Sequence, residues 1–335
     1  MKALTLKKYH KSSPVIEFSD VPKPTIKPNE MLVEVHAVGL NPIDNMIPTG
    51  TFKPVLHFTL PATLGSDLAG VVTEVGSQVT RFKPSDAIFA SIFDLGIGSL
   101  AEFAVVPESA AAMKPANLDF VQAASIPMVG LTAWQALKER ANLKAGQKVF
   151  IPAGSGGIGT FAIQLAKHLG ASVATTTSTK NIDLVRSLGA DTVVDYKKQA
   201  FEALLNNYDV VLGTTRGDTI EKSINILKPG SKILSLVGPL DVSFARARKL
   251  NGILALVFGL MSLKINRLSK KKGVDYSFLF VRPDGSQLSE ISKLLEAETI
   301  KPVIDKVFPF EQAKQALAYL GEGHAKGKVV VKIHE

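Results

Sequence analysis

The residues whose spacing most directly suggests chemistry form a glycine-rich turn between two apolar segments. Gly154, Gly156 and Gly159 follow the pattern Gly-x-Gly-x-x-Gly. A predicted strand over residues 148–152 precedes them, and a predicted helix over residues 159–169 follows, with another strand beyond it. Glycine lets the backbone approach a pyrophosphate, and the first N–H groups of the helix bind its oxygens. The pattern therefore predicts a dinucleotide-binding βαβ unit rather than a purely structural turn.

The second strand of this unit indicates which dinucleotide binds. Sites for NADH place an acidic residue near the end of that strand, about 20 residues after the motif. Here residues 175–181 carry hydroxyl groups and Lys180, and the next acidic residue is Asp183. Since a carboxylate repels a 2′-phosphate while hydroxyls and an ammonium attract it, we predict NADPH as the cofactor. Ser178 and Thr179 also suit the cap of the next helix, and this role is compatible with phosphate binding.

Several other chemistries lack the residues that they need. The chain of 335 residues has no cysteine, which excludes thiolate zinc ligands, disulfides and a cysteine nucleophile. Its six histidines form no closely spaced ligand pair, which argues against a zinc site. Gly154-Ser155-Gly156 lacks the Gly-x-Ser-x-Gly spacing of a hydrolase nucleophile elbow. We therefore predict no bound metal and no serine hydrolase activity.

The order of the predicted elements indicates two domains of different class. Up to about residue 112, short strands such as 31–38 and 68–75 alternate with proline-containing turns, which is typical of an antiparallel barrel or sandwich. After residue 120, strands and helices alternate, which predicts a parallel sheet covered by helices. The predicted strands of this second part cover residues 148–152, 172–177, 192–195, 208–212 and 232–237. The expected fold class is therefore α/β plus β.

Positive charge is concentrated in one segment that includes an apolar stretch. Of the formal net charge of +9, eight positive charges lie in residues 242–274, which contain no Asp or Glu. No nucleic-acid-binding motif accompanies them, so we predict no nucleic-acid binding and consider a weak contact with a membrane surface. The apolar residues 250–263 are fewer than the ~20 that span a bilayer, so no integral span is predicted. A buried core or dimer helix, a lid and an amphipathic surface helix remain open for this segment.

Short motifs distributed over nearly the whole chain resemble those of one enzyme family. The first part contains Asn41-Pro-Ile-Asp44 and Leu64-Gly-Ser-Asp-Leu-Ala-Gly-Val-Val72, and the domain junction contains Gly130-Leu-Thr-Ala-Trp134. The glycine turn, Leu188-Gly-Ala-Asp191 and Ala325-Lys-Gly-Lys-Val-Val330 follow in the family order. On these motifs the chain resembles the zinc-independent quinone oxidoreductase (zeta-crystallin-like) and enone reductase branch of the medium-chain dehydrogenases/reductases.

The resemblance implies a GroES-like β-barrel catalytic domain formed by residues 1–122 and 278–335. It implies a Rossmann domain with a doubly wound parallel sheet over residues 123–277, an active cleft between the two domains, and a homodimer. The residues expected to hold the pyrophosphate are Gly154, Ser155, Gly156, Gly157, Ile158 and Gly159, and those for the 2′-phosphate are Ser178, Lys180 and Tyr196. Near the nicotinamide or its ribose, the expected residues are Asn41, Thr132, Val237, Gly238, Phe280 and Lys328. Simpler interpretations remain open for three of them: Thr132 as a helix residue, Tyr196 as a strand-end aromatic and Lys328 as a surface lysine.

Three positions depart from the family pattern. Met46 stands where many relatives have a Tyr close to the substrate, so a phenol donor is absent. Pro48 stands where members of the family often have Arg, and Gly213 stands where Asp is usual. The substrate contacts at the first two positions and the cofactor contacts at the third therefore differ from the family pattern.

Together these observations predict a zinc-independent oxidoreductase that transfers hydride from NADPH to a small-molecule quinone or α,β-unsaturated carbonyl. Asn41 and Asp44 are the candidate catalytic residues, with a structural role in the loop as the alternative for Asp44. Two other functions remain open: a 2-alkenal or enone reductase specific for lipid-derived aldehydes, and a non-enzymatic NADPH-binding sensor associated with a membrane surface. The first residues lack the apolar core of a signal peptide, so we expect a cytoplasmic protein.

Overall fold

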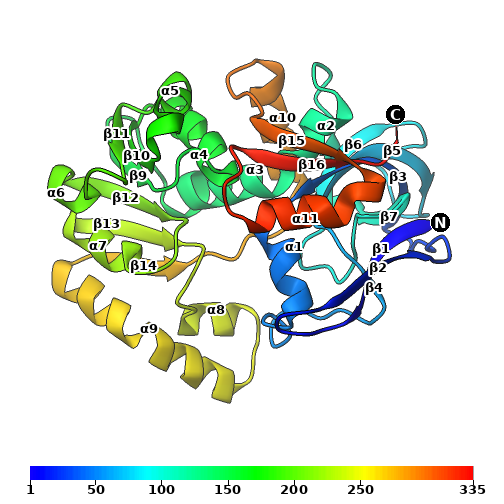
Figure 1. Cartoon of the computed structure of the whole chain (residues 1–335), viewed down its shortest axis with the longest axis horizontal. Coiled ribbons are helices and arrows are strands. Elements are labelled where there is room, and N and C mark those ends of the chain that lie inside the picture. Colours follow the sequence, from blue (N-terminus) through cyan, green and yellow to red (C-terminus); the bar gives the residue numbers. More distant parts are fainter. Residues whose placement is uncertain (335) are drawn as a thin grey trace. The chain divides into compact units, whose positions relative to one another are not determined.

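The computed structural model describes residues 1–334, and the chain divides into two compact units (Figure 1). Unit 1 comprises residues 1–131 together with the chain from residue 282 onward, and unit 2 comprises residues 132–281. Unit 1 is therefore discontinuous, because the chain leaves it for unit 2 and then returns. The predicted junctions follow residues 122 and 277, whereas the structural junctions follow residues 131 and 281.

Unit 1 is a mostly antiparallel β-domain around an apolar core, in which only β15 and β16 pair in parallel among the described strands. Its strands are β1 (Lys2–Lys8), β2 (Val15–Asp20), β3 (Glu30–Leu40), β4 (Ala62–Thr63), β5 (Asp67–Val75), β6 (Ala87–Ser91), β7 (Phe103–Pro107), β8 (Ala111–Met113), β15 (Ile304–Pro309) and β16 (Lys328–Lys332). The larger sheet has the order β15-β16-β3-β5-β6-β8, with β7 also paired to β3, and a smaller sheet has the order β2-β1-β4. Val33, Val35 and Leu68 are completely buried in the core. The antiparallel β-domain predicted for the first part of the chain is confirmed.

Short helices connect these strands. They are α1 (Pro42–Met46), α2 (Phe120–Ala124), α10 (Gly285–Glu296) and α11 (Ala313–Gly321), while α3 (Pro127–Ala133) crosses into unit 2. Helix α1 begins directly after β3, with Asn41 as its N-cap and Pro42 at its first position, and both residue types favour these places. This sharp strand-to-helix transition places Asn41 and Asp44 beside the start of β5.

Unit 2 is a parallel sheet with helical crossovers. Its strands are β9 (Lys148–Ile151), β10 (Ser172–Thr177), β11 (Thr192–Asp195), β12 (Tyr208–Gly213), β13 (Leu227–Ser235) and β14 (Asp275–Phe278). The order is β11-β10-β9-β12-β13-β14, so the direction of winding reverses beside β9, and such a switch point is where α/β sheets bind ligands. Helices α4 (Gly157–His168), α5 (Ile182–Ser187), α6 (Phe201–Leu204) and α7 (Thr219–Asn225) connect the strands. The predicted doubly wound sheet is confirmed.

The segment after β13 differs from its prediction. Helices α8 (Val242–Ala247) and α9 (Gly252–Lys272) precede β14, and α9 continues well beyond the apolar stretch that ends at residue 263. Within residues 1–334, α9 is the helix with the length and apolar composition of a membrane span, at a mean hydropathy of 1.4 with 22% of the window buried. A single such helix is weak evidence for a span. Most of α9 is exposed, so it is not the buried core helix that we considered.

Candidate functional site

The glycine turn connects β9 to α4 and has the geometry of a phosphate cradle. A Cβ atom at Gly154 would lie 2.1 Å from Thr175 Oγ1, and one at Gly159 would lie 2.5 Å from the carbonyl oxygen of Ala153. A Cβ at Gly156 would meet only that same carbonyl oxygen, at 3.4 Å. Packing within the protein therefore requires glycine at the first and third positions, whereas the second position lies open to a ligand.

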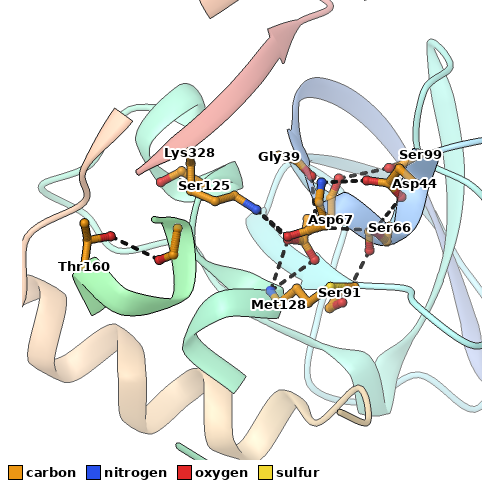
Figure 2. Close-up of polar contacts among 12 residues, drawn as sticks. Gly39, Asp44, Ser66, Asp67, Ser91, Ser99, Ser125, Met128, Thr160 and Lys328 are labelled. Carbon is orange, nitrogen blue, oxygen red and sulfur yellow. Dashed lines mark hydrogen bonds and ion pairs between the residues drawn. The ribbon is translucent and has the colours of Figure 1, made fainter. Parts of the chain in front are cut away.

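The N-terminus of α4 is free to bind an anion. Its N-cap is Gly156, which has no side chain to accept the first N–H groups of the helix. Figure 2 shows Thr160 in the first turn, where its hydroxyl donates to the carbonyl oxygen of Gly157 at 3.0 Å and so bonds within the helix. The turn residues therefore fit a pyrophosphate, which the helix dipole and the unbonded N–H groups attract.

The ends of β10 and β11 lie next to this turn. Ser155 Oγ bonds the hydroxyl of Thr177 at 3.0 Å and accepts from the side-chain amide of Asn181 at 3.1 Å. The side-chain oxygen of Asn181 is buried and has no hydrogen-bond partner among the described residues. An unsatisfied buried acceptor beside a ligand cradle is consistent with a partner that arrives with the cofactor.

The residues predicted for a 2′-phosphate follow the same two strands. Ser178 is buried, Lys180 is exposed, and Tyr196 is 61% exposed. Lys197 and Lys198 are also exposed beside Tyr196, and the sequence reasoning did not include them. These three lysines concentrate positive charge next to the hydroxyls at the end of β10.

An acidic residue that the sequence reasoning overlooked also lies here. Asp195 ends β11 and pairs with Thr177 across the parallel ladder. Its carboxylate accepts the hydroxyl of Thr179 at 2.5 Å and the N–H of Lys197 at 3.0 Å. The Thr179 hydrogen bond is the largest influence that lowers the pKa of Asp195. This carboxylate is therefore ionised but already bonded within the protein, and it is not presented as a free ribose acceptor.

The other predicted cofactor residues of unit 2 mostly follow strand ends as well. Val237 and Gly238 follow β13, where Ser235 Oγ donates to the carbonyl oxygen of Gly238 at 2.8 Å. Phe280 follows β14, with its ring centroid 5.4 Å from that of Phe244. Thr132 lies in α3 and is buried. Apart from Thr132, the fold brings the predicted residues of unit 2 to one edge of the sheet, where the carboxyl ends of its strands meet.

The departure at Gly213 has a physical reason. Gly213 is the last residue of β12, and a Cβ there would lie 2.3 Å from Cδ1 of Ile220. The following Thr214 donates its hydroxyl to the carbonyl oxygen of Pro152 at 2.7 Å. A larger residue at 213 would therefore clash with α7, and Thr214 is bonded to the strand-to-turn junction that precedes the glycines.

Unit 1 contains a buried polar cluster of four side chains from three segments of the chain: Asn41, Asp44, Asp67 and Lys328. Figure 2 labels Asp44, Asp67 and Lys328. The ammonium of Lys328 donates to Asn41 Oδ1 at 2.5 Å and lies 3.6 Å from the Asp67 carboxylate. Asp67 also accepts from Asn41 Nδ2 at 2.9 Å and from the N–H of Met128 at 3.1 Å. Lys328 is 4% exposed, so its interpretation as a surface lysine is wrong.

Asp44 occupies the other side of Asn41. Its carboxylate accepts the N–H of Asn41 at 2.7 Å and the hydroxyl of Ser66 at 2.8 Å. These bonds fix the N-terminus of α1 and thereby the Asn41 side chain. Asp44 is completely buried, which suits a positioning role better than direct contact with a substrate.

The electrostatics of the buried polar cluster are unbalanced, because it contains two carboxylates and one ammonium. Burial raises the pKa of Asp44 to about 7, although its hydrogen bonds oppose this. Burial also raises the pKa of Asp67 and lowers the pKa of Lys328, and the attraction between the two opposes both shifts. Asp67 and Lys328 therefore form the ion pair, and Asp44 is the group that holds or releases a proton near neutral pH.

No group of three or more His, Asp or Glu side chains within residues 1–334 is arranged to hold a metal ion. The histidines of unit 1 include His36, which stacks on Phe120 with ring centroids 4.1 Å apart. Burial lowers the pKa of His36, as expected for a packed imidazole. The absence of a bound zinc ion stays a prediction.

Comparison with known proteins identifies the family. Residues 27–116 match the alcohol dehydrogenase GroES-like domain, and residues 188–331 match a family described as zinc-binding dehydrogenase. The mitochondrial NAD(P)H oxidoreductase RTN4IP1 of Danio rerio is 37% identical over 359 residues, covering 100% of this chain and 92% of that protein. The chloroplastic NADPH-dependent alkenal/one oxidoreductase of Arabidopsis thaliana is 36% identical over 323 residues, covering 93% of this chain and 74% of that protein.

A solved structure supports the same assignment. The quinone oxidoreductase from Coxiella burnetii superposes with a TM-score of 0.84 at 29% identity, covering 100% of this chain and 99% of that one. This likeness, with the matching domain family, confirms the predicted combination of a GroES-like domain and a Rossmann sheet.

The comparisons also correct the expected location. We expected a cytoplasmic protein because the first residues do not resemble a signal peptide. The relatives above are named as mitochondrial and chloroplastic proteins, which points away from a purely cytoplasmic location. The first residues instead form β1 of the β-domain, and the composition of a structural strand carries no information about the compartment.

The similarity extends over the full length of the chain, through both units and the motifs that connect them. The matched families, the relatives and the solved structure all belong to one class of nicotinamide-dependent enzyme. The chain therefore belongs to the medium-chain dehydrogenase/reductase family, in its quinone oxidoreductase branch, and is an NAD(P)H-dependent oxidoreductase.

Proposed function

We propose that the protein uses NADPH to reduce a quinone or an α,β-unsaturated carbonyl compound, without a zinc ion. The observation that carries the choice of cofactor is the chemistry at the ends of β10 and β11. Hydroxyl groups and exposed Lys180 stand there, and the carboxylate that ends β11, Asp195, is already bonded to Thr179 and Lys197. This arrangement favours a 2′-phosphate over two free ribose hydroxyls.

The chain's own residues would bind and orient the cofactor. Backbone N–H groups from Gly157 onward would hold the pyrophosphate at the N-terminus of α4, since the N–H of Gly156 already donates to the Ala153 carbonyl oxygen. Ser178, Lys180 and Tyr196 would hold the 2′-phosphate. Val237, Gly238, Phe280 and Thr132 are proposed for the nicotinamide and its ribose. When bound, NADPH supplies the hydride. The protein's contribution is alignment of donor and acceptor, which supplies several kcal/mol of a typical barrier reduction, up to roughly 7–11.

The buried polar cluster of unit 1 would position groups for this reaction. The predicted role of Asn41 and Lys328 beside the nicotinamide stays a proposal, since the structure shows their side chains bonded to each other. We propose that Asp44 acts through Asn41, by holding the N-terminus of α1, and not as the proton donor. Protonation of the reduced product by solvent is then the simplest route.

The acceptor class is proposed from the relatives. One is named for alkenal and enone reduction and another structure for quinone reduction, and both acceptors share an electron-poor carbon conjugated to a carbonyl oxygen. Met46 replaces the tyrosine found in many relatives, so no phenol at this position would bind the carbonyl oxygen. A 2-alkenal or enone reductase specific for lipid-derived aldehydes is therefore a second candidate.

We also propose a homodimer. Strand β14 is the last strand in the order of the unit 2 sheet, and an edge strand with unpaired backbone groups can continue into the sheet of a second copy. Sedimentation velocity on the purified protein would test this proposal. A single monomeric species at all concentrations would contradict it.

The experiment for the proposed reaction follows NADPH oxidation at the nicotinamide absorbance with matched quinones, 2-alkenals and cyclic enones. Turnover of quinones would support the main proposal, and turnover confined to 2-alkenals would favour the second candidate. Tight NADPH binding without turnover of any acceptor would contradict both. Saturated analogues of the alkenals serve as the control, because they lack the conjugated carbon that accepts hydride.

A further inference from the structure

Helix α9 presents an apolar face to the outside of unit 2 over its first three turns. Ile253, Leu256 and Leu260 are 75%, 65% and 64% exposed, and Met261 and Leu263 are exposed as well. Figure 1 shows α9, in yellow to orange, along the outside of unit 2 next to α7 and α8. Large apolar side chains grouped on one exposed face mark an interaction surface.

The opposite face fixes α9 in place, so the exposure does not come from a frayed segment. Phe258, Ser262, Ile265 and Ser269 are buried at helical spacing. Ile265 belongs to the apolar core of unit 2, and the Phe258 ring centroid lies 6.0 Å from that of Phe244. The helix is also capped at both ends, by the side chain of Asn251 and by left-handed Gly273.

The outward face changes from apolar to basic along the helix. Leu256, Leu260 and Leu263 are followed on the same face by Arg267 and Lys271, at spacings of four, three, four and four residues. Lys270 and Lys272, in the last turn of the helix, are also exposed. No acidic residue lies between Asp241 and Asp275. In the described structure one ion pair of α9 joins Lys264 to Glu221 of α7, at 2.8 Å.

The apolar and basic residues on the outer face of α9 fit an anionic lipid surface better than they fit a second copy of the chain. Two α9 helices packed side by side in parallel would bring two basic ends together, and in the antiparallel arrangement each basic end would lie on an apolar face. A lipid bilayer with anionic headgroups offers apolar chains and negative charge at adjacent depths. Charge complementarity therefore favours the lipid surface.

We propose that α9 docks the protein on the surface of an anionic lipid bilayer. The apolar turns around Leu256 and Leu260 enter the boundary between headgroups and acyl chains, and Arg267 and Lys270 to Lys272 contact the phosphates. At about 1.5 Å per residue the helix has the length of a span. It nevertheless lies in the plane of the interface, because its inner face is part of the unit 2 core and its last turns are cationic.

The test is co-sedimentation of the purified full chain with vesicles of phosphatidylcholine, alone or mixed with phosphatidylglycerol. The protein is expected to bind the mixed vesicles at low salt, to bind the neutral vesicles far more weakly, and to leave the mixed vesicles at high salt. No binding to the mixed vesicles at low salt would overturn the proposal. Binding that resists both high salt and alkaline carbonate would overturn the in-plane position and indicate a span.

Two variants distinguish the contribution of the basic end of α9 to vesicle binding from that of its apolar turns. Lys270→Gln, Lys271→Gln and Lys272→Gln together are expected to weaken partitioning about 100-fold, since each lysine near an anionic surface contributes about 1 kcal/mol. Leu256→Ser with Leu260→Ser is expected to weaken it about 10-fold or more. Both variants should retain wild-type NADPH oxidation with soluble acceptors, because none of these residues is proposed to bind the cofactor or substrate.

Matched controls distinguish this surface from general effects. Lys8→Gln, Lys11→Gln and Lys314→Gln together change the net charge equally at exposed lysines of unit 1, and Leu204→Ser removes an exposed leucine at the end of α6. Both controls should bind vesicles like the wild type, and an equal loss in the charge control would overturn the proposal. Conversion of a dimer to a monomer by the Leu256 and Leu260 substitutions, without vesicle binding by the wild type, would assign the face to a second copy instead.

Discussion

The glycine turn of unit 2 and the buried polar cluster of unit 1 are assembled in opposite ways. The turn is one continuous stretch between β9 and α4, and its open position is Gly156, where an added Cβ would meet only the Ala153 carbonyl oxygen, at 3.4 Å. The cluster joins Asn41 and Asp44, from the start of α1, to Asp67 and Lys328 from two other segments, and Lys328 bonds a residue 287 positions away. The turn is thus shaped for a ligand, whereas the cluster is stabilised by bonds among its own members. Substitution of the open Gly156 should therefore cost binding, and removal of one partner of the Asp67–Lys328 ion pair should cost stability.

The largest effect is expected for Asp67→Ala, which leaves the Lys328 ammonium buried without its counter-charge. Removing one partner of a buried ion pair costs about 3–5 kcal/mol of the free energy of unfolding, measurable by urea denaturation. The double variant Asp67→Leu with Lys328→Met is the control and should recover part of this loss, because it leaves no unpaired charge in the interior. The recovery is incomplete, since Asn41 and the N–H of Met128 lose hydrogen-bond partners. Equal stability of Asp67→Ala and the wild type would show that the ion pair does not stabilise unit 1.

Asp44 should give the cluster a distinctive pH dependence. Its pKa rises from 3.8 to about 7 on folding, so between these values the folded state holds a proton that the unfolded state has released. The stabilising contribution of Asp44 to the free energy of unfolding is therefore fully present below about pH 4. It is lost as the pH rises through about 7, at ~1.4 kcal/mol per pKa unit.

The measurement is the difference in unfolding free energy between the wild type and Asp44→Asn across this pH range. The difference isolates Asp44 from carboxylates with a lowered pKa, such as Asp191 and Asp195, whose contributions run in the opposite direction. At low pH, Asp44→Asn should have nearly the same free energy of unfolding as the wild type. At pH 7, it should have a higher free energy of unfolding than the wild type. Parallel stability curves for the two proteins would show that Asp44 ionises normally.

Gly156→Ala tests the turn. Because the added Cβ has room within the protein, we expect little change in the free energy of unfolding and a loss of NADPH affinity of about 10- to 100-fold, or about 1.4–2.8 kcal/mol. Fluorescence titration with NADPH and thermal unfolding measure the two quantities. Gly159→Ala is the contrasting variant, since its Cβ would lie 2.5 Å from the Ala153 carbonyl and should also lower stability. Full NADPH affinity in Gly156→Ala would refute the assignment of the cradle.

Lys180→Gln should have the smallest and most selective effect. Loss of one charged hydrogen bond to the 2′-phosphate is expected to weaken NADPH binding about 10-fold, since such bonds contribute about 1.5–3 kcal/mol, and to leave NADH binding unchanged. Lys138→Gln, at another lysine of unit 2, is the matched control. An equal loss for both cofactors would remove Lys180 from the 2′-phosphate site.

The two regions also show what a sequence can predict. The glycine turn and most strands of unit 2 follow from local patterns, because the βαβ unit is formed by residues close together in the chain. Strand β14 was not predicted, since its four residues are too few to show the alternation of apolar and polar side chains that indicates a strand. Asp195 was also missed as a residue near the cofactor. The acidic residue of an NADH site is expected at the end of β10, whereas Asp195 ends the neighbouring strand β11, and only the parallel pairing of the two strands brings it opposite Thr177.

The buried polar cluster could be predicted only in part. Asn41, Asp44 and Lys328 were singled out through family motifs, but their mutual bonds depend on long-range strand pairing of β3 with β5 and β16. Asp67 lay inside a quoted motif without an assigned role, although an acid within an apolar strand is a signal of a buried partner. The length of α9 was underestimated because basic residues ended the apolar pattern while the helix itself continued to Gly273.

The preference for NADPH can be measured as kcat/KM for NADPH and for NADH with one quinone or enone acceptor. We expect turnover with NADPH and a kcat/KM at least about 10-fold lower with NADH, corresponding to about 1.4 kcal/mol or more from the 2′-phosphate contacts. Equal use of both cofactors, or a preference for NADH, would contradict the role given to Ser178, Lys180 and Tyr196.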